Sequence, residues 1–368
     1  MRVLLGAAVS LVAAFVSAVG ATPRTETLYA NANGTVSGFA QDGSIIAWFT
    51  PGGAGCNTVH VRSLANGTRA ELPKQGDTQN VTCRWNVGTA PVSVAIARNQ
   101  PSVLWTLHEN SPLQFDYLVG AGVGDSRERR YQQLAHTSRG AGLWLGGVAG
   151  NGGTLVYGVT SVDYVDEAGC LAGTDTCALK IVANGGGVYR VGADHRPKLV
   201  PGTSGGAVDV ATSGDRVAYV RAGTVDKRGR PVAGADKPIE IVDAVSGQVA
   251  SSVTTQGTPV AIALSANALA TLEQTPLGLR LAWYAPDTGS PAGSVPVALA
   301  ASTELSVSDR LAVFHVGRSI RAVDLATGRV RSLATAAGMP IGLSVEGTRI
   351  AWAENLKHGG WRIRAYNY

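Results

Sequence analysis

The chain has 368 residues, of which 47 are glycine and only 15% are charged, and its formal net charge is +5. Apolar residues alternate with small and polar ones almost throughout, so the glycines indicate many turns rather than disorder. The basic residues form no runs interleaved with aromatic residues, and the densest group, residues 127–130, contains Glu128. This pattern argues against nucleic-acid binding.

Residues 1–21 have the composition of a secretory signal peptide. A basic start precedes an apolar run at residues 3–19, and small residues follow. The run approaches the shortest membrane-spanning length, so an uncleaved anchor is the alternative. Its serine and alanine content favours cleavage. We therefore expect a mature domain of residues 22–368, secreted or otherwise extracytoplasmic, in a chain of bacterial composition, with no membrane span after cleavage.

A short apolar strand recurs seven times, each time after a turn that contains Gly, Asp or Asn. Aligned on Ala351, the counterparts are Ala47, Leu104, Val156, Ala218, Ala270, Ala312 and Ala351 itself. We call this residue the kernel of its repeat. The spacing of the kernels varies widely, which indicates loops of different length around a constant packed unit.

Each repeat contains four strand-length segments. The first alternates small and apolar residues, as in 260–265 and 341–345, and the second carries the kernel. The third ends in an Asp/Asn and Gly hairpin turn such as 287–289, and the fourth resembles an edge strand, as in 329–335. This pattern predicts an all-β, seven-bladed β-propeller. Residues 115–134 lack a clear hairpin signal, so six blades with one irregular unit is the alternative count.

The last repeat stops after three segments, whereas an additional strand precedes the first repeat at residues 25–30. We expect this N-terminal strand to complete the last blade, closing the ring and covering an open edge. The kernel phrase (a turn, Arg or Thr, then Ile/Val-Ala-Trp/Tyr) resembles the WD40-like repeats of TolB-type propellers. The Trp-Asp dipeptide of true WD40 repeats does not occur, and the resemblance implies a fold but no site.

The four cysteines form two local pairs, Cys56 with Cys83 and Cys170 with Cys177. In an exported protein an even number indicates disulfides, and three connectivities are open. The propeller pattern places Cys56 in a loop between the second and third strands and Cys83 in the link to the next blade. Such loops emerge on the same face, which favours the two local pairings. A zinc site would need a nearby histidine.

Two loops between second and third strands are long, at residues 161–176 in blade 3 and 222–237 in blade 4. Long loops on a rigid scaffold are common binding sites. The candidate binding residues are Asp163, Asp166, Glu167, Asp175, Arg228 and Arg230. The alternative is two solvated insertions that pair with each other. The carboxylates at 163–167 lack the EF-hand order, yet a divalent metal such as calcium is the one cofactor they suggest.

Two further patterns concern catalysis. Residues 202–206 (GTSGG) resemble the nucleophile segment of chymotrypsin-like proteases, but Thr203 replaces its Asp, and the position fits a link between blades. His108, Glu109 and His315 follow kernel strands, where some propeller enzymes, lactonases and certain lyases, hold a metal or a general base. The alternative for these histidines is a hydrogen-bonded position at a strand end.

The sequence therefore predicts an exported binding or scaffold protein. Its partner would be a protein, peptide or glycan of the cell envelope, held on the face that carries the blade 3 and 4 loops. The competing hypothesis is a metal-assisted hydrolase or lyase, lactonase-like, with its site at the channel mouth. We favour binding because no His or carboxylate pattern recurs from blade to blade.

Overall fold

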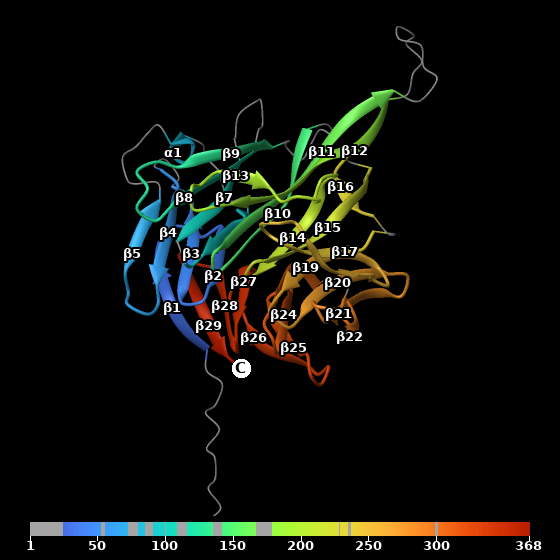
Figure 1. Cartoon of the computed structure of the whole chain (residues 1–368). Helices are drawn as coiled ribbons and strands as arrows, with labels where there is room; N and C mark the ends of the chain where they lie inside the picture. The colour runs from blue at the N-terminus through green and yellow to red at the C-terminus, as the bar shows by residue number, and fades with distance from the viewer. Residues whose placement is uncertain are drawn as a thin grey trace, which may run out of the picture.

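The computed structural model describes residues 25–52, 56–72, 80–84, 91–99, 101–108, 116–134, 142–166, 179–227, 229–234, 237–298 and 301–368. Seven antiparallel sheets follow one another around a ring (Figure 1). The prediction of a seven-bladed β-propeller is confirmed. The predicted signal peptide lies outside the described residues.

Each blade places its first strand at the channel and its fourth at the perimeter. Blade 1 contains β2 (Gly38–Asp42), β3 (Ile45–Thr50), β4 (Thr58–Ser63) and β5 (Arg69–Leu72). Blade 2 contains β6 (Val94–Ala97), β7 (Ser102–His108), β8 (Asp116–Gly122) and β9 (Arg129–Leu134). Blade 3 contains β10 (Gly142–Asn151), β11 (Thr154–Asp166), β12 (Leu179–Val191) and β13 (Pro197–Leu199). A one-turn helix, α1 (Val81–Arg84), precedes blade 2.

The remaining blades repeat this order with one addition. Blade 4 contains β14 (Ala207–Ser213), β15 (Arg216–Val225), β17 (Ile239–Asp243) and β18 (Val249–Val253), and blade 5 contains β19 (Thr258–Leu264), β20 (Leu269–Thr275), β21 (Gly278–Tyr284) and β22 (Pro291–Pro296). Blade 6 contains β23 (Ala301–Val307), β24 (Leu311–Val316), β25 (Ser319–Asp324) and β26 (Val330–Thr335). Blade 7 contains β27 (Pro340–Glu346), β28 (Arg349–Asn355) and β29 (Trp361–Asn367). In blade 4 an extra strand, β16 (Pro231–Ala233), pairs with the C-terminal part of β15.

The N-terminal strand closes the ring as predicted. β1 (Thr25–Asn31) pairs antiparallel with β29, so the last blade contains both ends of the described chain (Figure 1). Tyr29 of β1 lies between two blades, with its ring centroid 5.4 Å from that of Trp361 and 5.0 Å from that of Trp48 in blade 1. Closure therefore combines a hydrogen-bonded ladder with an aromatic contact across the seam.

The kernels are fully buried because their side chains fill the spaces between blades. Ala47 packs in a cluster with Trp105 of the next blade, while its neighbour Trp48 packs with Ala351 of the previous one. Successive strand residues point to opposite faces of a sheet, so each kernel strand joins two blade interfaces. A small kernel leaves room for the large aromatic side chain of the adjacent blade.

Blade 6 corrects the sequence alignment by one residue. There Ala312 packs toward blade 5, whereas Val313 packs toward blade 7 and occupies the position predicted for Ala312. Its neighbour Phe314 then takes the interface position that Trp48 has in blade 1. The residues that follow the turn before β24 fit the repeat pattern with either Ala312 or Val313 as the kernel. Only the packing of these side chains distinguishes the two registers.

Candidate functional site

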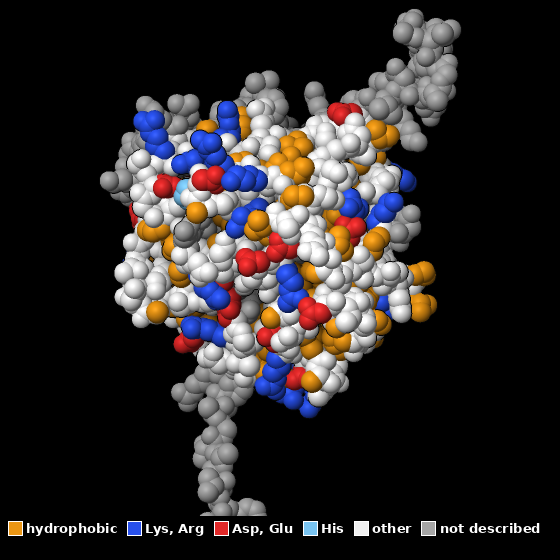
Figure 2. All heavy atoms as spheres, in the orientation of Figure 1, with side chains coloured by type: hydrophobic (Ala, Val, Ile, Leu, Met, Phe, Trp, Pro, Cys, Tyr) orange, Lys and Arg blue, Asp and Glu red, His pale blue; other side chains and the backbone are white. Residues whose placement is uncertain are grey.

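A pocket opens between blades 3 and 4 at the end where their inner strands begin. Its volume is about 310 Å³, and it is lined by Trp144, Leu145, Gly146, Thr160, Ala207, Val208, Asp226, Arg230, Pro231 and Val232. We call it the blade 3–4 pocket. Hydrophobic side chains gather on the surface beside the base of the β11–β12 hairpin (Figure 2). The pocket therefore lies on the face where the sequence predicted binding.

Two β-bulges shape the pocket. The ladder of β10 shifts between Leu145 and Gly147, and that of β14 shifts between Ala207 and Asp209. Between the bulges the strands nearly touch, since a Cβ added to Gly146 would lie 2.1 Å from the carbonyl oxygen of Ala207. Only glycine fits there. Bulges re-aim side chains near functional sites, and these two form the inner wall of the pocket.

The outer wall belongs to the blade 4 insert. Asp226 and Arg230 enclose a tight turn in which the Asp226 N–H donates to the Arg230 carbonyl at 2.8 Å. The Arg230 guanidinium donates to the Asp226 carboxylate at 2.9 Å and forms an ion pair with it at 2.8 Å. The chain then continues into β16, which brings Pro231 and Val232 to the pocket. A polar rim thus borders an apolar hollow.

The six predicted binding residues are only partly brought together. Arg230 lines the pocket, whereas Asp163 is exposed on the β11–β12 hairpin, which projects beyond the ring (Figure 1). Asp163 accepts a hydrogen bond of 2.7 Å from the Asn184 amide across this hairpin. Asp166 is the last residue of β11 and faces Leu179 in the ladder. Glu167, Asp175 and Arg228 lie outside the described residues.

Sequence reasoning missed the apolar wall. Trp144, Leu145 and Val208 belong to segments that read as ordinary inner strands. Their contribution depends on two bulges and on a distant insert, and a local pattern indicates neither.

A central channel runs between the inner strands of all seven blades. Its volume is about 760 Å³, and its described ionisable lining residues are Asp209, Glu304, Glu346 and His315. Asp209 accepts hydrogen bonds from its neighbour Val210 N–H at 2.8 Å and from Ile262 N–H of blade 5 at 2.9 Å. Burial nevertheless dominates and raises the pKa of Asp209 to about 7.

The two histidines considered for catalysis both have structural partners. His315 lines the channel, with Nδ1 2.8 Å from the Gly317 carbonyl oxygen and Nε2 3.7 Å from Glu304. His108 contacts Asp116 at 2.8 Å and the Pro91 carbonyl at 3.3 Å. Burial lowers the pKa of His315, but Glu304 and the Gly317 carbonyl outweigh this effect and raise the pKa overall. The arrangement matches hydrogen-bonded positions at strand ends.

A metal site in the protein would need several ligands close together. No group of three or more His, Cys, Asp or Glu side chains converges within the described part of the chain. Glu109 lies outside it. The suggestion of a calcium or other divalent metal site stays a prediction.

One predicted disulfide is present. Cys56, in the loop after β3, is bonded to Cys83 in α1, which joins blade 1 to the link before blade 2. The adjacent Asn57 side chain donates to the Thr82 carbonyl at 2.8 Å and strengthens the same junction. Cys170 and Cys177 lie outside the described residues.

The protease-like segment at 202–206 is a link between blades. Thr203 is fully buried and donates to the Val200 carbonyl at 2.8 Å. Arg221 donates to the carbonyls of Ser204 and Gly202 at 2.8 and 3.1 Å. The segment is held through its backbone, which supports the structural interpretation.

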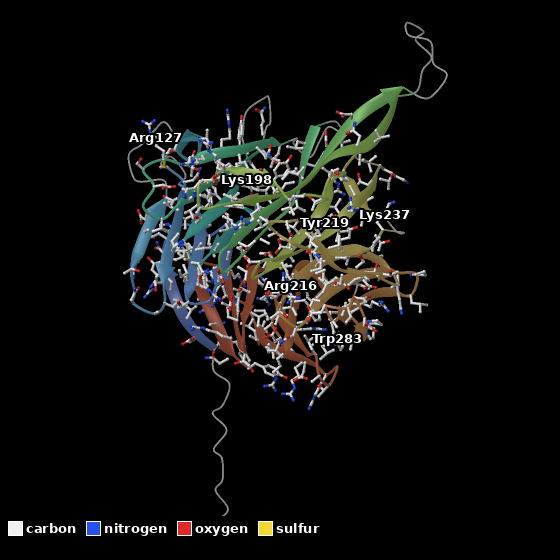
Figure 3. The ribbon with its side chains drawn as sticks, viewed as in Figure 1. Arg127, Lys198, Arg216, Tyr219, Lys237 and Trp283 are labelled. Atoms are coloured by element: carbon white, nitrogen blue, oxygen red, sulfur yellow. A yellow bond between two sulfur atoms is a disulfide. The ribbon has the colours of Figure 1, made fainter. Side chains whose placement is uncertain are left out.

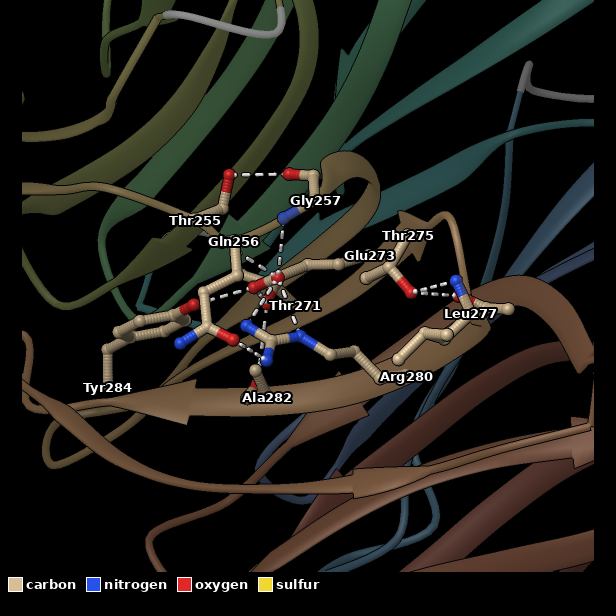
Figure 4. A network of polar contacts seen from close by, with 11 residues as sticks. Thr255, Gln256, Gly257, Thr271, Glu273, Thr275, Leu277, Arg280, Ala282 and Tyr284 are labelled. Carbon is tan, nitrogen blue, oxygen red and sulfur yellow. Dashed lines mark hydrogen bonds and ion pairs between the residues drawn. The ribbon is translucent and has the colours of Figure 1, made fainter.

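A buried carboxylate holds the corresponding link of blade 5 (Figure 4). Glu273 is fully buried and accepts hydrogen bonds from Arg280 at 2.9 Å and from the Tyr284 hydroxyl at 2.6 Å. It also accepts from the backbone N–H groups of Gln256 and Gly257, both at 3.2 Å. This network fixes the link and leaves the carboxylate no role at the surface.

Comparisons of the sequence with known proteins assign no family to the chain. No protein-family model matches the chain, and no curated protein matches its sequence. The resemblance to TolB-type propellers therefore stays a prediction at the level of the family.

Within the described residues the helical content is the four-residue α1, and no helix there is long and apolar enough to cross a membrane.

Several solved structures are similar in shape at low identity. An acylaminoacyl peptidase in complex with Z-Gly-Gly-Phe-chloromethyl ketone has a TM-score of 0.53 at 10% identity, over 91% of this chain and 51% of that one. The β-propeller domain of the trilobed protease from Pyrococcus furiosus has a TM-score of 0.52 at 8% identity, over 91% and 95%. A puromycin hydrolase has a TM-score of 0.50 at 13% identity, over 90% and 51%.

These likenesses concern the propeller alone. The chain spans about half the length of the acylaminoacyl peptidase and of the puromycin hydrolase. The Pyrococcus furiosus propeller is described as having an open velcro topology, whereas here β1 pairs with β29.

Proposed function

We propose that this chain is an exported binding protein that holds its partner, a protein, peptide or glycan of the cell envelope, on the face carrying the blade 3 and 4 inserts. The observation that carries the proposal is the blade 3–4 pocket, which combines an apolar hollow with a charged rim on that face. The Cys56–Cys83 disulfide is consistent with an oxidising compartment.

The lining of the pocket favours a peptide among these partners. Leu145, Val208 and Val232 are partly exposed and offer aliphatic surface, while Asp226 and Arg230 offer a carboxylate and a guanidinium at the edge. A hollow of about 310 Å³ accommodates one large apolar side chain. The rim then recognises the polar backbone beside that side chain, as in other peptide sites that pair an apolar anchor with polar neighbours.

Selection from a random peptide library on the purified mature protein tests this proposal. A glutamate in the pocket, Val232→Glu, should weaken the selected peptides about tenfold or more, because a buried charge opposes apolar contact. The matched control is Val249→Glu, since Val249 is 52% exposed on β18. Thermal unfolding of both variants checks that they fold.

Equal affinity of both variants for the selected peptides would overturn the assignment of this pocket. Binding of glycans on an array, abolished by Val232→Glu and not by the control, would replace the peptide by a sugar at the same site.

A further inference from the structure

The central channel is a second cavity, separate from the blade 3–4 pocket. Its volume of about 760 Å³ lies in the range of small-molecule sites and far exceeds that of a single ion. Among the described lining residues, three are carboxylates (Asp209, Glu304 and Glu346), neither Lys nor Arg is present, and the one basic side chain is His315, with Nε2 3.7 Å from Glu304. The channel therefore presents negative charge in a confined space, which favours a cationic occupant.

Two of these carboxylates lie at equivalent levels of the channel wall. Asp209 and Glu304 precede the tight turns of their blades, at Gly214 and Asp309, by the same number of residues. Both lie at bulges, between Ala207 and Asp209 in β14 and between Ala301 and Leu305 in β23. Their blades are separated by blade 5. Two acceptors thus stand at one level on separate parts of the wall.

Asp209 has a charge that its surroundings leave uncompensated. It accepts two backbone N–H bonds, from Val210 and Ile262, but forms no ion pair with a described Lys, Arg or His. Burying a carboxylate without a cation is unfavourable, so a bound cation would relieve this cost.

Glu346 provides a third acceptor at the far end. It ends β27, next to the turn, and accepts a hydrogen bond of 3.0 Å from Gly43 N–H. Burial raises its pKa above the usual range; nearby Asp42 adds to this effect, whereas the Gly43 N–H and Arg98 oppose it. Between the two ends the wall combines apolar side chains such as Val94 with polar side chains such as Ser306 and Ser344.

We infer that the channel binds a linear aliphatic polyamine, with ammonium groups on Asp209 and Glu304 at one end and a further ammonium group toward Glu346. The acceptors are separated along the channel, as the ammonium groups of such a molecule are separated by methylene groups. A single metal ion fits less well, because it needs ligands that converge, and no such group occurs among the described residues.

Isothermal titration of the mature protein with spermidine at pH 7 tests this inference. Putrescine, a shorter diamine, should bind more weakly, and magnesium or calcium chloride serves as the comparison for charge alone. Replacing Asp209→Asn or Glu304→Gln should weaken spermidine about tenfold, because each removes a charge-assisted hydrogen bond. The matched control, Asp287→Asn, removes an exposed carboxylate paired with Arg216 and should leave affinity unchanged.

The wild-type protein supplies a second readout that needs no variant. Since the pKa of Asp209 is raised to about 7, the carboxyl is partly protonated at that pH, and a cation bound beside it should expel a proton. Titrations in buffers of different ionisation enthalpy measure this release. No heat with spermidine, no proton release, or equal weakening by Asp287→Asn would overturn the inference. Equal binding of calcium and spermidine would show an ion site instead.

Discussion

Charged pairs in this propeller differ most in their burial. Glu273 of blade 5 is fully buried and pairs with Arg280 (Figure 4). In contrast, Asp287 is exposed and pairs at 2.5 Å with Arg216 of blade 4, which is labelled in Figure 3. Exposed charges of both signs are interspersed on the face seen in Figure 2. An exposed pair is screened by water, whereas a buried pair whose partner is removed leaves an uncompensated charge.

The change Glu273→Ala should therefore lower the free energy of unfolding by about 3–5 kcal/mol, because Arg280 and two backbone N–H groups lose their acceptor. For Asp287→Ala we expect a loss below about 1 kcal/mol. Urea unfolding of both variants measures the difference. Similar losses would show that the Glu273 network contributes no more than a surface pair.

The raised pKa of Asp209 predicts how stability depends on pH. The folded state holds this proton up to about pH 7, whereas the unfolded chain releases it near the ordinary value of 3.8. The unfolded state therefore binds fewer protons between these values, and the free energy of unfolding falls as pH rises through this window. The Asp209→Asn variant should lose that part of the slope. Unfolding midpoints at pH 4, 5, 6, 7 and 8 test it, and parallel curves for the two proteins would contradict the assignment.

Strands were the elements best predicted from the sequence. Kernel strands alternate between two buried faces, and hairpin turns need Gly or Asp at fixed places, so both leave a local pattern. Glu354 illustrates what a local pattern does not show. It is a charged residue near the end of the kernel strand β28, yet it is fully buried and accepts a hydrogen bond from Ala337 N–H at 2.7 Å. The blade 6 register was missed for the same reason, since Ala312 and Val313 differ only in packing.

The Cys56–Cys83 bond joins the loop after β3 to the helix α1. Its closed segment has a sequence separation of 27. Restricting a loop of that length in the unfolded chain corresponds to about 3.5 kcal/mol of stabilisation in the chain-entropy view. The double variant Cys56→Ser/Cys83→Ser should lose up to this amount in urea unfolding.

Reduction of the wild-type protein provides the control for that prediction. Dithiothreitol should produce the same loss in the wild type and no further loss in the double variant. An unchanged double variant would mean that the junction of blades 1 and 2 is fixed by contacts such as the Asn57–Thr82 hydrogen bond.

At the scale of the whole molecule, repeats predicted the ring but not its hollows. The number of blades and their order follow from copies of one unit. The blade 3–4 pocket instead joins Trp144, Val208 and Val232, which are far apart in the sequence and belong to different elements. The channel acceptors Asp209 and Glu304 are brought to one level only by the closed ring. Both sites are properties of the assembly of blades and not of any single repeat.

Ring closure itself is open to a direct test. Deleting residues 25–31 removes β1, exposes the edge of β29 and leaves Trp361 and Trp48 without the Tyr29 ring. We expect a lower melting temperature and concentration-dependent association, because an unpaired edge strand pairs with other chains. A synthetic peptide of residues 25–31 added in trans should restore the monomer, whereas the same peptide with Tyr29→Ser should do so poorly. Unchanged melting and mass in the deletion variant would show that blade packing holds the ring without its seventh outer strand.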